Sequence, residues 1–286
     1  MRDFKELKEV DVKLLLLKGS SIKVENLVVK PYTIGEIIEN YGYVNYMQNL
    51  QWISISIDDF LSSVNDERKI AVLNKQKENL KTFDFYYKLG GKEILEMLIE
   101  SMKMIFRTDD VIALDNGVIA VNFTKRGFIY EDEEGNFHYD TEVVESLTED
   151  EVTVIHRDNF DDIVEVVKLQ NYLKKPEKDE SPNPVDEQTR KLMEQMEMNR
   201  KKVAEKKKVQ QANEYSDEDG IDISDIISAV SSKSNSLNKF NIWDFTLYQL
   251  YDEYSRLELI DNYQFSIQAM MAGAEKVDLK HWSSKI

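Results

Sequence analysis

Residues 238–286 read NKFNIWDFTLYQLYDEYSRLELIDNYQFSIQAMMAGAEKVDLKHWSSKI, and this aromatic stretch is the most informative part of the chain. It predicts a helical hairpin with a short tail. Six of its residues recur at helical spacings and predict one apolar stripe: Trp243, Leu247, Leu250, Tyr251, Tyr254 and Leu257. Phe245 and Tyr248 lie off that stripe, so the first helix is expected to be apolar on more than one side. Such a helix is either fully packed or meets a partner.

Four segments of this stretch carry a resemblance to a known family. They are residues 242–251 (IWDFTLYQLY), 256–257 (RL), 268–274 (QAMMAGA) and 279–283 (LKHWS). Together they resemble the C-terminal helical part of tail assembly chaperones from long-tailed bacteriophages and prophages of Gram-positive bacteria. The resemblance implies a non-catalytic chaperone in the host cytoplasm. Such proteins bind the tape measure protein, which is very long and largely helical, and help tail tube subunits to gather around it.

The resemblance also implies a partner-binding surface on the first helix. The residues expected to contact the tape measure protein are Trp243, Phe245, Leu247, Tyr248, Leu250, Tyr251, Tyr254 and Leu257. Tail tube protein is a second candidate partner, and a homo-oligomer is left open. We also expect this module to pack on a second helix around Phe265, Ile267, Met270 and Met271. The alternative is that the aromatic residues form only the core of the hairpin.

Composition limits the other classes of function. The chain has 286 residues and a net charge of −17, so free nucleic acid is a poor partner, because binding phosphate needs a cationic surface. The absence of cysteine excludes disulfides and thiolate metal sites. The apolar run from Leu14 to Leu17 is too short for a signal-peptide core, and no segment approaches the roughly 20 apolar residues of a membrane span. We therefore expect no membrane contact.

The sequence divides into three parts. Residues 1–173 predict a folded α+β domain, residues 174–237 a flexible charged linker with a solvated helix, and residues 238–286 the small α-helical module. The linker begins with three of the four prolines of the chain, Pro176, Pro182 and Pro184. Residues 186–212 favour a helix with a thin apolar stripe, for which a coiled coil is the alternative.

Within the first part, helices alternate with short antiparallel strands. A hairpin is predicted at residues 22–29, a helix capped by Thr33 with Glu36 as its capping-box partner, and an amphipathic helix from Ile94 to Phe106. Residues 111–123 predict a second hairpin around Asn116-Gly117, followed by another at residues 127–139. A strand at residues 152–155 and a helix that starts after Asp158 or Asn159 complete this part.

No motif of catalysis stands out. The three histidines, His138, His156 and His281, are far apart and lack the spacing of metal ligands. Gly90-Gly91 has neither the Lys-Ser/Thr of a phosphate loop nor the third glycine of a dinucleotide turn. We therefore expect no enzyme, cofactor or metal. Two functions remain, a chaperone with a tethered aromatic module and a permanent structural component of a phage tail or capsid, and the polar linker favours the chaperone.

Overall fold

A computed structural model describes residues 1–54, 81–89, 91–114, 117–123, 129–131, 137–146, 148, 151–173, 222–273 and 279–284. Its contacts divide the chain into two compact units. The first unit joins Met1–Leu173 to Val230–Ile286, and the second comprises Lys174–Ala229. The prolines of the linker and the predicted helix at residues 186–212 lie outside the described residues.

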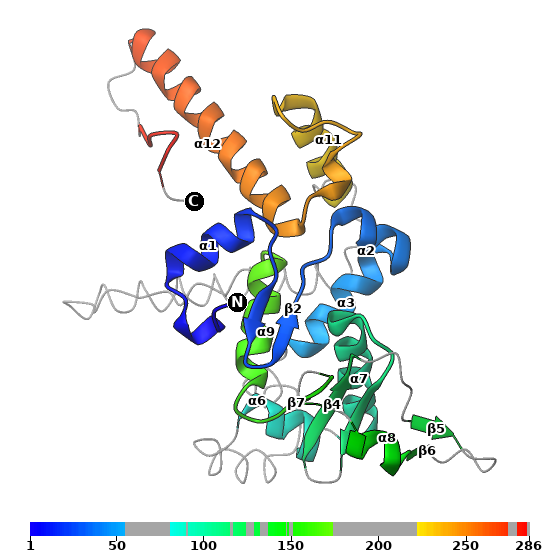
Figure 1. Ribbon diagram of the computed structural model, residues 1–286. Helices are drawn as coiled ribbons and strands as arrows, with labels where there is room; N and C mark the ends of the chain where they lie inside the picture. The colour runs from blue at the N-terminus through cyan, green and yellow to red at the C-terminus, as the bar shows by residue number, and fades with distance from the viewer. Residues whose placement is uncertain are drawn as a thin grey trace, which may run out of the picture. The chain divides into compact units, whose positions relative to one another are not determined.

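The chain is a mixed α+β protein, as predicted, and its first strands form a tight hairpin (Figure 1). After the short helix η1 (Phe4–Glu6) and the helix α1 (Glu9–Leu17), β1 (Ile22–Val24) pairs antiparallel with β2 (Leu27–Val29). The first and last residues of each three-residue strand point to the same, inner face and are buried: Ile22, Val24, Leu27 and Val29. Glu25 makes the turn with a φ of 52°, a left-handed conformation that is uncommon for a residue with a side chain.

Two helices follow the hairpin. Thr33 caps α2 (Ile34–Asn40) through the predicted capping box, in which Thr33 Oγ1 accepts from the Glu36 amide and the Glu36 carboxylate accepts from the Thr33 amide. The helix α3 (Tyr43–Ile53) packs against α7 (Gly91–Phe106), whose buried stripe confirms the predicted amphipathic helix. Before α7 the chain forms the short α6 (Thr82–Asp84) and a π-helical turn, η3 (Phe85–Leu89).

A three-stranded antiparallel sheet follows in the order β3-β4-β7. The strands β3 (Val111–Leu114) and β4 (Val118–Asn122) pair with Leu114 opposite Val118, which confirms the predicted hairpin at this place. The strand β7 (Val152–Ile155) adds to the other edge of β4. A separate two-stranded ribbon of β5 (Ile129–Glu131) and β6 (Phe137–Tyr139) and the short helix α8 (Thr141–Ser146) lie between β4 and β7 in the chain.

The helix α9 (Phe160–Gln170) is at the centre of the core. It contacts both strands of the first hairpin, α3 and α6, and its inward side chains are almost fully buried: Phe160, Ile163, Val166 and Val167. The Phe160 ring lies 5.4 Å from Phe83 and 5.6 Å from Tyr86, measured between centroids. Gln170 Nε2 donates to the Val29 carbonyl, so the end of α9 is fixed to the end of the hairpin.

The C-terminal part differs from the predicted helical hairpin. After α11 (Ile223–Lys233) and the 3-10 turn η4 (Ile242–Asp244), α12 runs from Leu247 to Met271 as one continuous helix. The predicted second helix is therefore the distal half of the first, because no glycine or proline interrupts residues 247–271. Trp243 was expected on the helical stripe and Phe245 on another side of the same helix, and both placements were wrong. They precede α12, since Thr246 and Gln249 form a capping box that begins the helix at Leu247.

The start of α12 is built into the N-terminal fold. Thr33 and Thr246, the N-caps of α2 and α12, form an antiparallel bridge, and the Ile34 amide donates to the Phe245 carbonyl at 2.7 Å. Gly35 allows this close approach, because a Cβ there would lie 3.2 Å from the Trp243 carbonyl oxygen. Residues 238–286 were expected as a module on a tether, whereas the contacts group residues 230–286 with residues 1–173 in one compact unit.

Candidate functional site

The first turns of α12 are anchored by a group of tyrosines. Tyr172, just after α9, stacks on Tyr251 with 5.4 Å between ring centroids and 12° between ring planes. The rings of Tyr172 and Tyr248 meet edge to face, with 5.6 Å between their centroids. On the other side of the helix, Gln249 Nε2 donates to the Leu17 carbonyl at the end of α1. These contacts fix the beginning of α12 to two helices of the N-terminal part.

The eight residues predicted to bind a partner lie along η4 and the first three turns of α12. Leu247 and Leu250 are 1% and 0% exposed, so they belong to the core. Tyr248, Tyr251, Tyr254 and Leu257 are half-buried, and the rings of Tyr248 and Tyr251 face Tyr172. Trp243 is 38% exposed and donates through Nε1 to the Lys239 carbonyl. The structure brings these residues together, but it turns several of them toward the chain itself.

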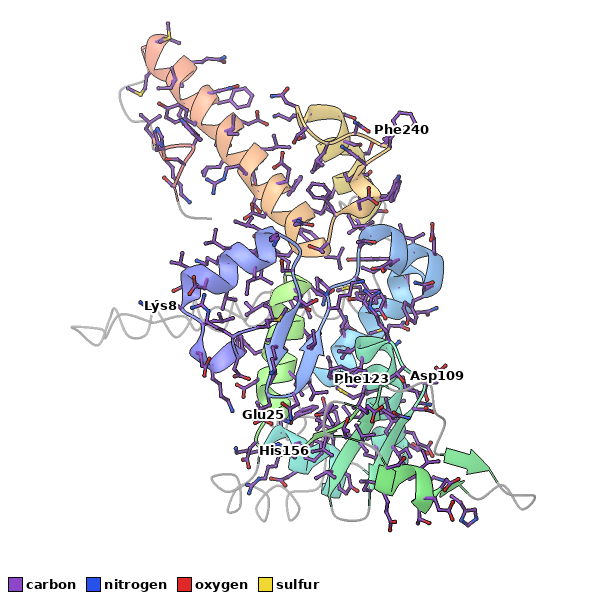
Figure 2. All side chains as sticks on the ribbon, in the orientation of Figure 1. Lys8, Glu25, Asp109, Phe123, His156 and Phe240 are labelled. Atoms are coloured by element: carbon purple, nitrogen blue, oxygen red, sulfur yellow. The ribbon has the colours of Figure 1, made fainter. Side chains whose placement is uncertain are left out.

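The exposed apolar side chains of α12 lie in its distal half. Phe265 is 67% exposed, Met270 48% and Met271 84%. The sequence pattern predicts these residues in a second, packing helix, outside the partner-binding set. The signal that could have placed them correctly is the uninterrupted helical sequence from Leu247 onward. A second exposed aromatic residue, Phe240, points away from the connector before η4 (Figure 2).

The C-terminal residues 279–284 return along one side of α12. Arg256 donates through Nη1 to the carbonyl oxygens of Trp282 and Ser284, at 2.8 and 2.9 Å. The His281 ring meets the edge of Tyr263 with 5.4 Å between centroids. The tail and the helix therefore run in opposite directions over about two helical turns.

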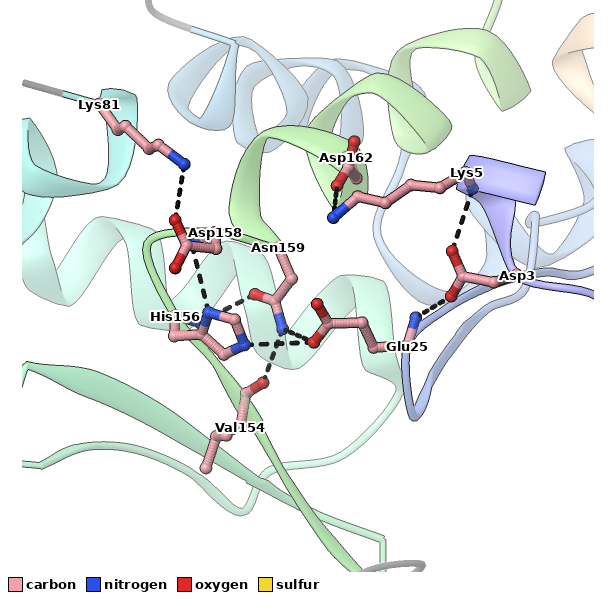
Figure 3. A network of polar contacts seen from close by, with 9 residues as sticks. All are labelled: Asp3, Lys5, Glu25, Lys81, Val154, His156, Asp158, Asn159 and Asp162. Atoms are coloured by element: carbon pink, nitrogen blue, oxygen red, sulfur yellow. Dashed lines mark hydrogen bonds and ion pairs between the residues drawn. The ribbon is translucent and has the colours of Figure 1, made fainter. Parts of the chain in front are cut away.

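A polar network joins the hairpin turn to the start of α9 (Figure 3). Glu25 Oε2 lies 3.1 Å from His156 Nε2 and accepts from Asn159 Nδ2 at 3.0 Å. The Asp158 amide donates to His156 Nδ1 at 3.1 Å. Because Nδ1 is an acceptor, the neutral ring carries its proton on Nε2 and donates it to Glu25.

This network holds backbone in place. Asn159 is 1% exposed, and its side chain accepts from the His156 amide and donates to the Val154 carbonyl as well as to Glu25. The Glu25 amide donates to Asp3 Oδ2, and Lys5 pairs with Asp162 at 3.0 Å. The network thus connects the N-terminus, the left-handed turn and the β7–α9 junction. His156 contributes to this junction, and its side chain is 31% exposed.

An open groove of about 570 Å³ lies between α2, α3 and the end of α7. Its lining residues are Tyr32, Asn40, Tyr41, Asn49, Glu100, Lys103, Met104, Arg107, Thr108 and Asp109. The Arg107 guanidinium lies 3.8 Å from the Tyr32 ring centroid and forms two hydrogen bonds with the Glu36 carboxylate. Lys103 pairs with Glu100 at 2.7 Å. Both cations of the groove are thus already matched by carboxylates.

The described residues contain no cluster of three or more histidine, aspartate or glutamate side chains arranged to hold a metal ion. Among the described helices, none combines the length and the apolar character needed to cross a membrane. The exposed apolar side chains of α12 make this helix the candidate functional surface.

Comparison with known proteins relates the C-terminal part to phage proteins. A family model described as the YomV second domain matches residues 206–286, less than a third of the chain. YomV is a phage-type protein of a Bacillus prophage, so this part of the chain is related to a phage-associated domain family. No curated protein and no solved structure gives a significant match.

Proposed function

We propose that this protein is a non-catalytic assembly chaperone of a phage or prophage, which binds the tape measure protein in the host cytoplasm. Two observations on sequence support the proposal. The last fifty residues resemble tail assembly chaperones, and a phage-associated family model matches residues 206–286. The observation that carries the proposal is the two-part character of α12, which is anchored in its first half and exposes apolar side chains in its second.

The anchored half positions the surface, and the distal half supplies it. Leu247 and Leu250 are buried in the protein, so they cannot contact the client and contribute only by fixing the position of α12. Phe265, Met270 and Met271 are exposed. An aromatic side chain is a common energetic anchor of an interface, and methionines adapt their shape to different partners. A helical client with many similar segments calls for such a tolerant surface.

Co-expression with the tape measure protein of the same phage tests the proposal. We expect the wild-type chain to keep that client in solution. The triple variant Phe265→Ala/Met270→Ala/Met271→Ala should bind it roughly thirtyfold more weakly, a loss of about 2 kcal/mol. Its helix content should be kept, because alanine is the strongest helix former.

Phe240→Ala is the matched control, since Phe240 is 94% exposed and lies outside α12. It should leave client binding unchanged. If the triple variant holds the client as well as wild type does, the distal half of α12 is not the client surface. If the wild-type chain itself fails to hold the client, the chaperone function is wrong. Self-association that disappears in the triple variant would assign the surface to a second copy of the chain instead.

A purified virion separates this function from its main alternative. A chaperone acts before assembly is complete and should be absent from the finished particle. A permanent tail or capsid component would be present there in a fixed number per particle. Quantitative mass spectrometry of purified virions gives the answer.

A further inference from the structure

The C-terminal tail covers one side of α12 through a small number of contacts. Arg256 and Tyr263 are seven residues apart, two turns of helix, and therefore lie on the same side. The tail contacts both of them, with Ser284 at Arg256 and His281 at Tyr263. Figure 1 shows the red C-terminal segment beside α12. Leu259 and Ile260 lie between these two points on the same side of the helix, and Leu259 is only 8% exposed.

The two hydrogen bonds from Arg256 to the tail do not depend on the side chains of the tail. Arg256 binds two main-chain carbonyl oxygens, and the turn that presents them is closed by the Ser284 amide, which donates to the His281 carbonyl at 2.9 Å. The tail side chains Leu279 and Trp282 are 42% and 48% exposed. Any backbone with two free carbonyls, such as the last turn of another helix, offers the same acceptors to Arg256.

Arg256 has an alternative partner one turn away. Asp252 precedes it by four residues, the spacing and order at which an acid and a base pair well along a helix. Among the described residues, no hydrogen bond or ion pair satisfies the Asp252 carboxylate, although the charge of Arg256 acts on it. Partial burial raises the pKa of Asp252, an effect that Arg256 opposes and Glu253 reinforces. The carboxylate would therefore gain from a closer guanidinium.

We propose that residues 279–284 form a displaceable strap on α12, and that Arg256 exchanges between the strap carbonyls and the Asp252 carboxylate as the strap is bound or released. Release uncovers the side of α12 that carries Leu259, Ile260, Tyr263 and Ile267. This inference rests on the proposed function: the uncovered side of α12 is a second client surface, which the strap occupies in the free protein. The occupant that replaces the strap is a helical client segment, whose terminal carbonyls take the place of those of Trp282 and Ser284.

The absence of cysteine from the chain allows a direct measurement of strap position. The pair Tyr263→Cys/His281→Cys places the only two thiols of the full-length protein at the contact between helix and strap. Its rate of disulfide formation reports how often the strap is bound, with no client present. Adding Arg256→Met, which keeps the length of the side chain and removes its donors, should slow this rate about tenfold. Adding Asp252→Asn, which weakens the alternative partner, should raise it or leave it unchanged.

A dye that binds exposed apolar surface, anilinonaphthalene sulfonate, provides the second readout. Arg256→Met in the otherwise native chain should increase dye binding severalfold, whereas Lys239→Met, an exposed control on the connector, should not. The reference for the oxidation rate is the double-cysteine protein, and the reference for dye binding is the native chain. If Arg256→Met leaves both values within twofold of these references, Arg256 does not hold the strap and the proposal is overturned. A faster oxidation rate with Arg256→Met would overturn it as well.

The link to the client is tested with the same thiol pair. The oxidised protein, with its strap locked, should bind the tape measure protein at least fivefold more weakly than the reduced protein. Equal binding in the two states would show that the strap does not guard a client surface. If neither state binds the client, the proposed function fails, while the oxidation rate and the dye still decide whether the strap exchanges.

Discussion

The ring of Tyr172 stacks on the ring of Tyr251, with 5.4 Å between centroids and 12° between planes. Tyr172 has a φ of 56° and lies just after the central helix α9, whereas Tyr251 belongs to the second turn of α12. This one contact connects the core of the N-terminal part to the helix that carries the proposed client surface.

Replacing Tyr251 by alanine should destabilise the protein by about 2 kcal/mol. The ring is half-buried, so its loss removes part of a buried apolar area together with an aromatic pair worth roughly 1 kcal/mol. Urea unfolding measures the change. Phe240→Ala removes a ring that is 94% exposed and should cost less than about 0.5 kcal/mol. Equal costs for the two variants would mean that the tyrosines do not anchor α12.

Gly35→Ala should lower the melting temperature. In an open helical position this change is stabilising by about 1 kcal/mol, because alanine has the higher helix propensity. Here the new Cβ would lie 3.2 Å from the Trp243 carbonyl oxygen and 3.5 Å from the Trp243 Cβ, so η4 would have to move. Glu39→Ala on the exposed side of the same helix is the control and should be neutral. A melting temperature that rises in Gly35→Ala would refute the close approach.

Glu36→Gln should flatten the dependence of stability on pH at the acid end. The hydrogen bonds from Arg107 lower the pKa of Glu36 from 4.5 to about 2. The ionised form is therefore favoured by folding, and its contribution is complete above pH 4.5 and is lost as the pH falls toward 2. We expect a contribution of about 2 kcal/mol, measured by urea unfolding across this range.

The glutamine variant keeps the capping box, because its amide oxygen still accepts from the Thr33 amide. A loss of helix capping would instead lower stability equally at every pH. Glu39→Gln, at an exposed position of the same helix, should follow the wild-type curve. If it flattens the curve as much as Glu36→Gln does, the Arg107 pair is not the cause.

Asn159→Asp should destabilise the protein by about 3 kcal/mol at neutral pH. The side chain is buried, and its amide donates to both Glu25 Oε2 and the Val154 carbonyl. In an aspartate, a carboxylate oxygen would replace the donor Nδ2 and face two other acceptors, the Glu25 carboxylate and the Val154 carbonyl. It would also place a second negative charge beside Glu25. Its pKa would be raised, so the variant should recover stability as the pH falls and the carboxyl group is protonated.

Asn159→Ala separates this charge effect from the loss of hydrogen bonds. It also removes the amide but adds no carboxyl group. The difference in stability between the alanine and aspartate variants should therefore narrow between about pH 7 and pH 5. A constant difference over this range would show that the aspartate does not face Glu25.

The local elements were predictable because their signals are local. Thr33 and Glu36 gave the start of α2, the Asn116-Gly117 pair gave the β3–β4 hairpin, and the apolar stripe gave α7. The capping box of Thr246 and Gln249 was equally readable and would have excluded Trp243 from the helix. These features depend on residues within four positions of one another, which is the range over which sequence patterns act.

The placement of α12 could not be predicted in this way. The apolar stripe in its sequence indicates that Leu247 and Leu250 are buried, as the structure shows, but it does not identify the residues that bury them. The residues that hold the start of α12, Leu17 and Tyr172 among them, come from distant parts of the chain, and no sequence pattern identifies their partners. The same holds for the strap, since Arg256 binds carbonyl oxygens that every residue carries. The sequence could predict an apolar helix here, whereas tertiary packing decides which part of it remains exposed.

The bridge between Thr33 and Thr246 has a consequence for biosynthesis. These residues are more than 200 positions apart, so the ribosome must add more than 200 residues after Thr33 before the two N-caps can meet. At about 5–20 residues per second, this takes roughly 10 to 40 seconds. During that interval the surface around Gly35 has no η4 to cover it. The N-terminal part therefore emerges incomplete, and α12 reaches its anchored position only after Thr246 has been made.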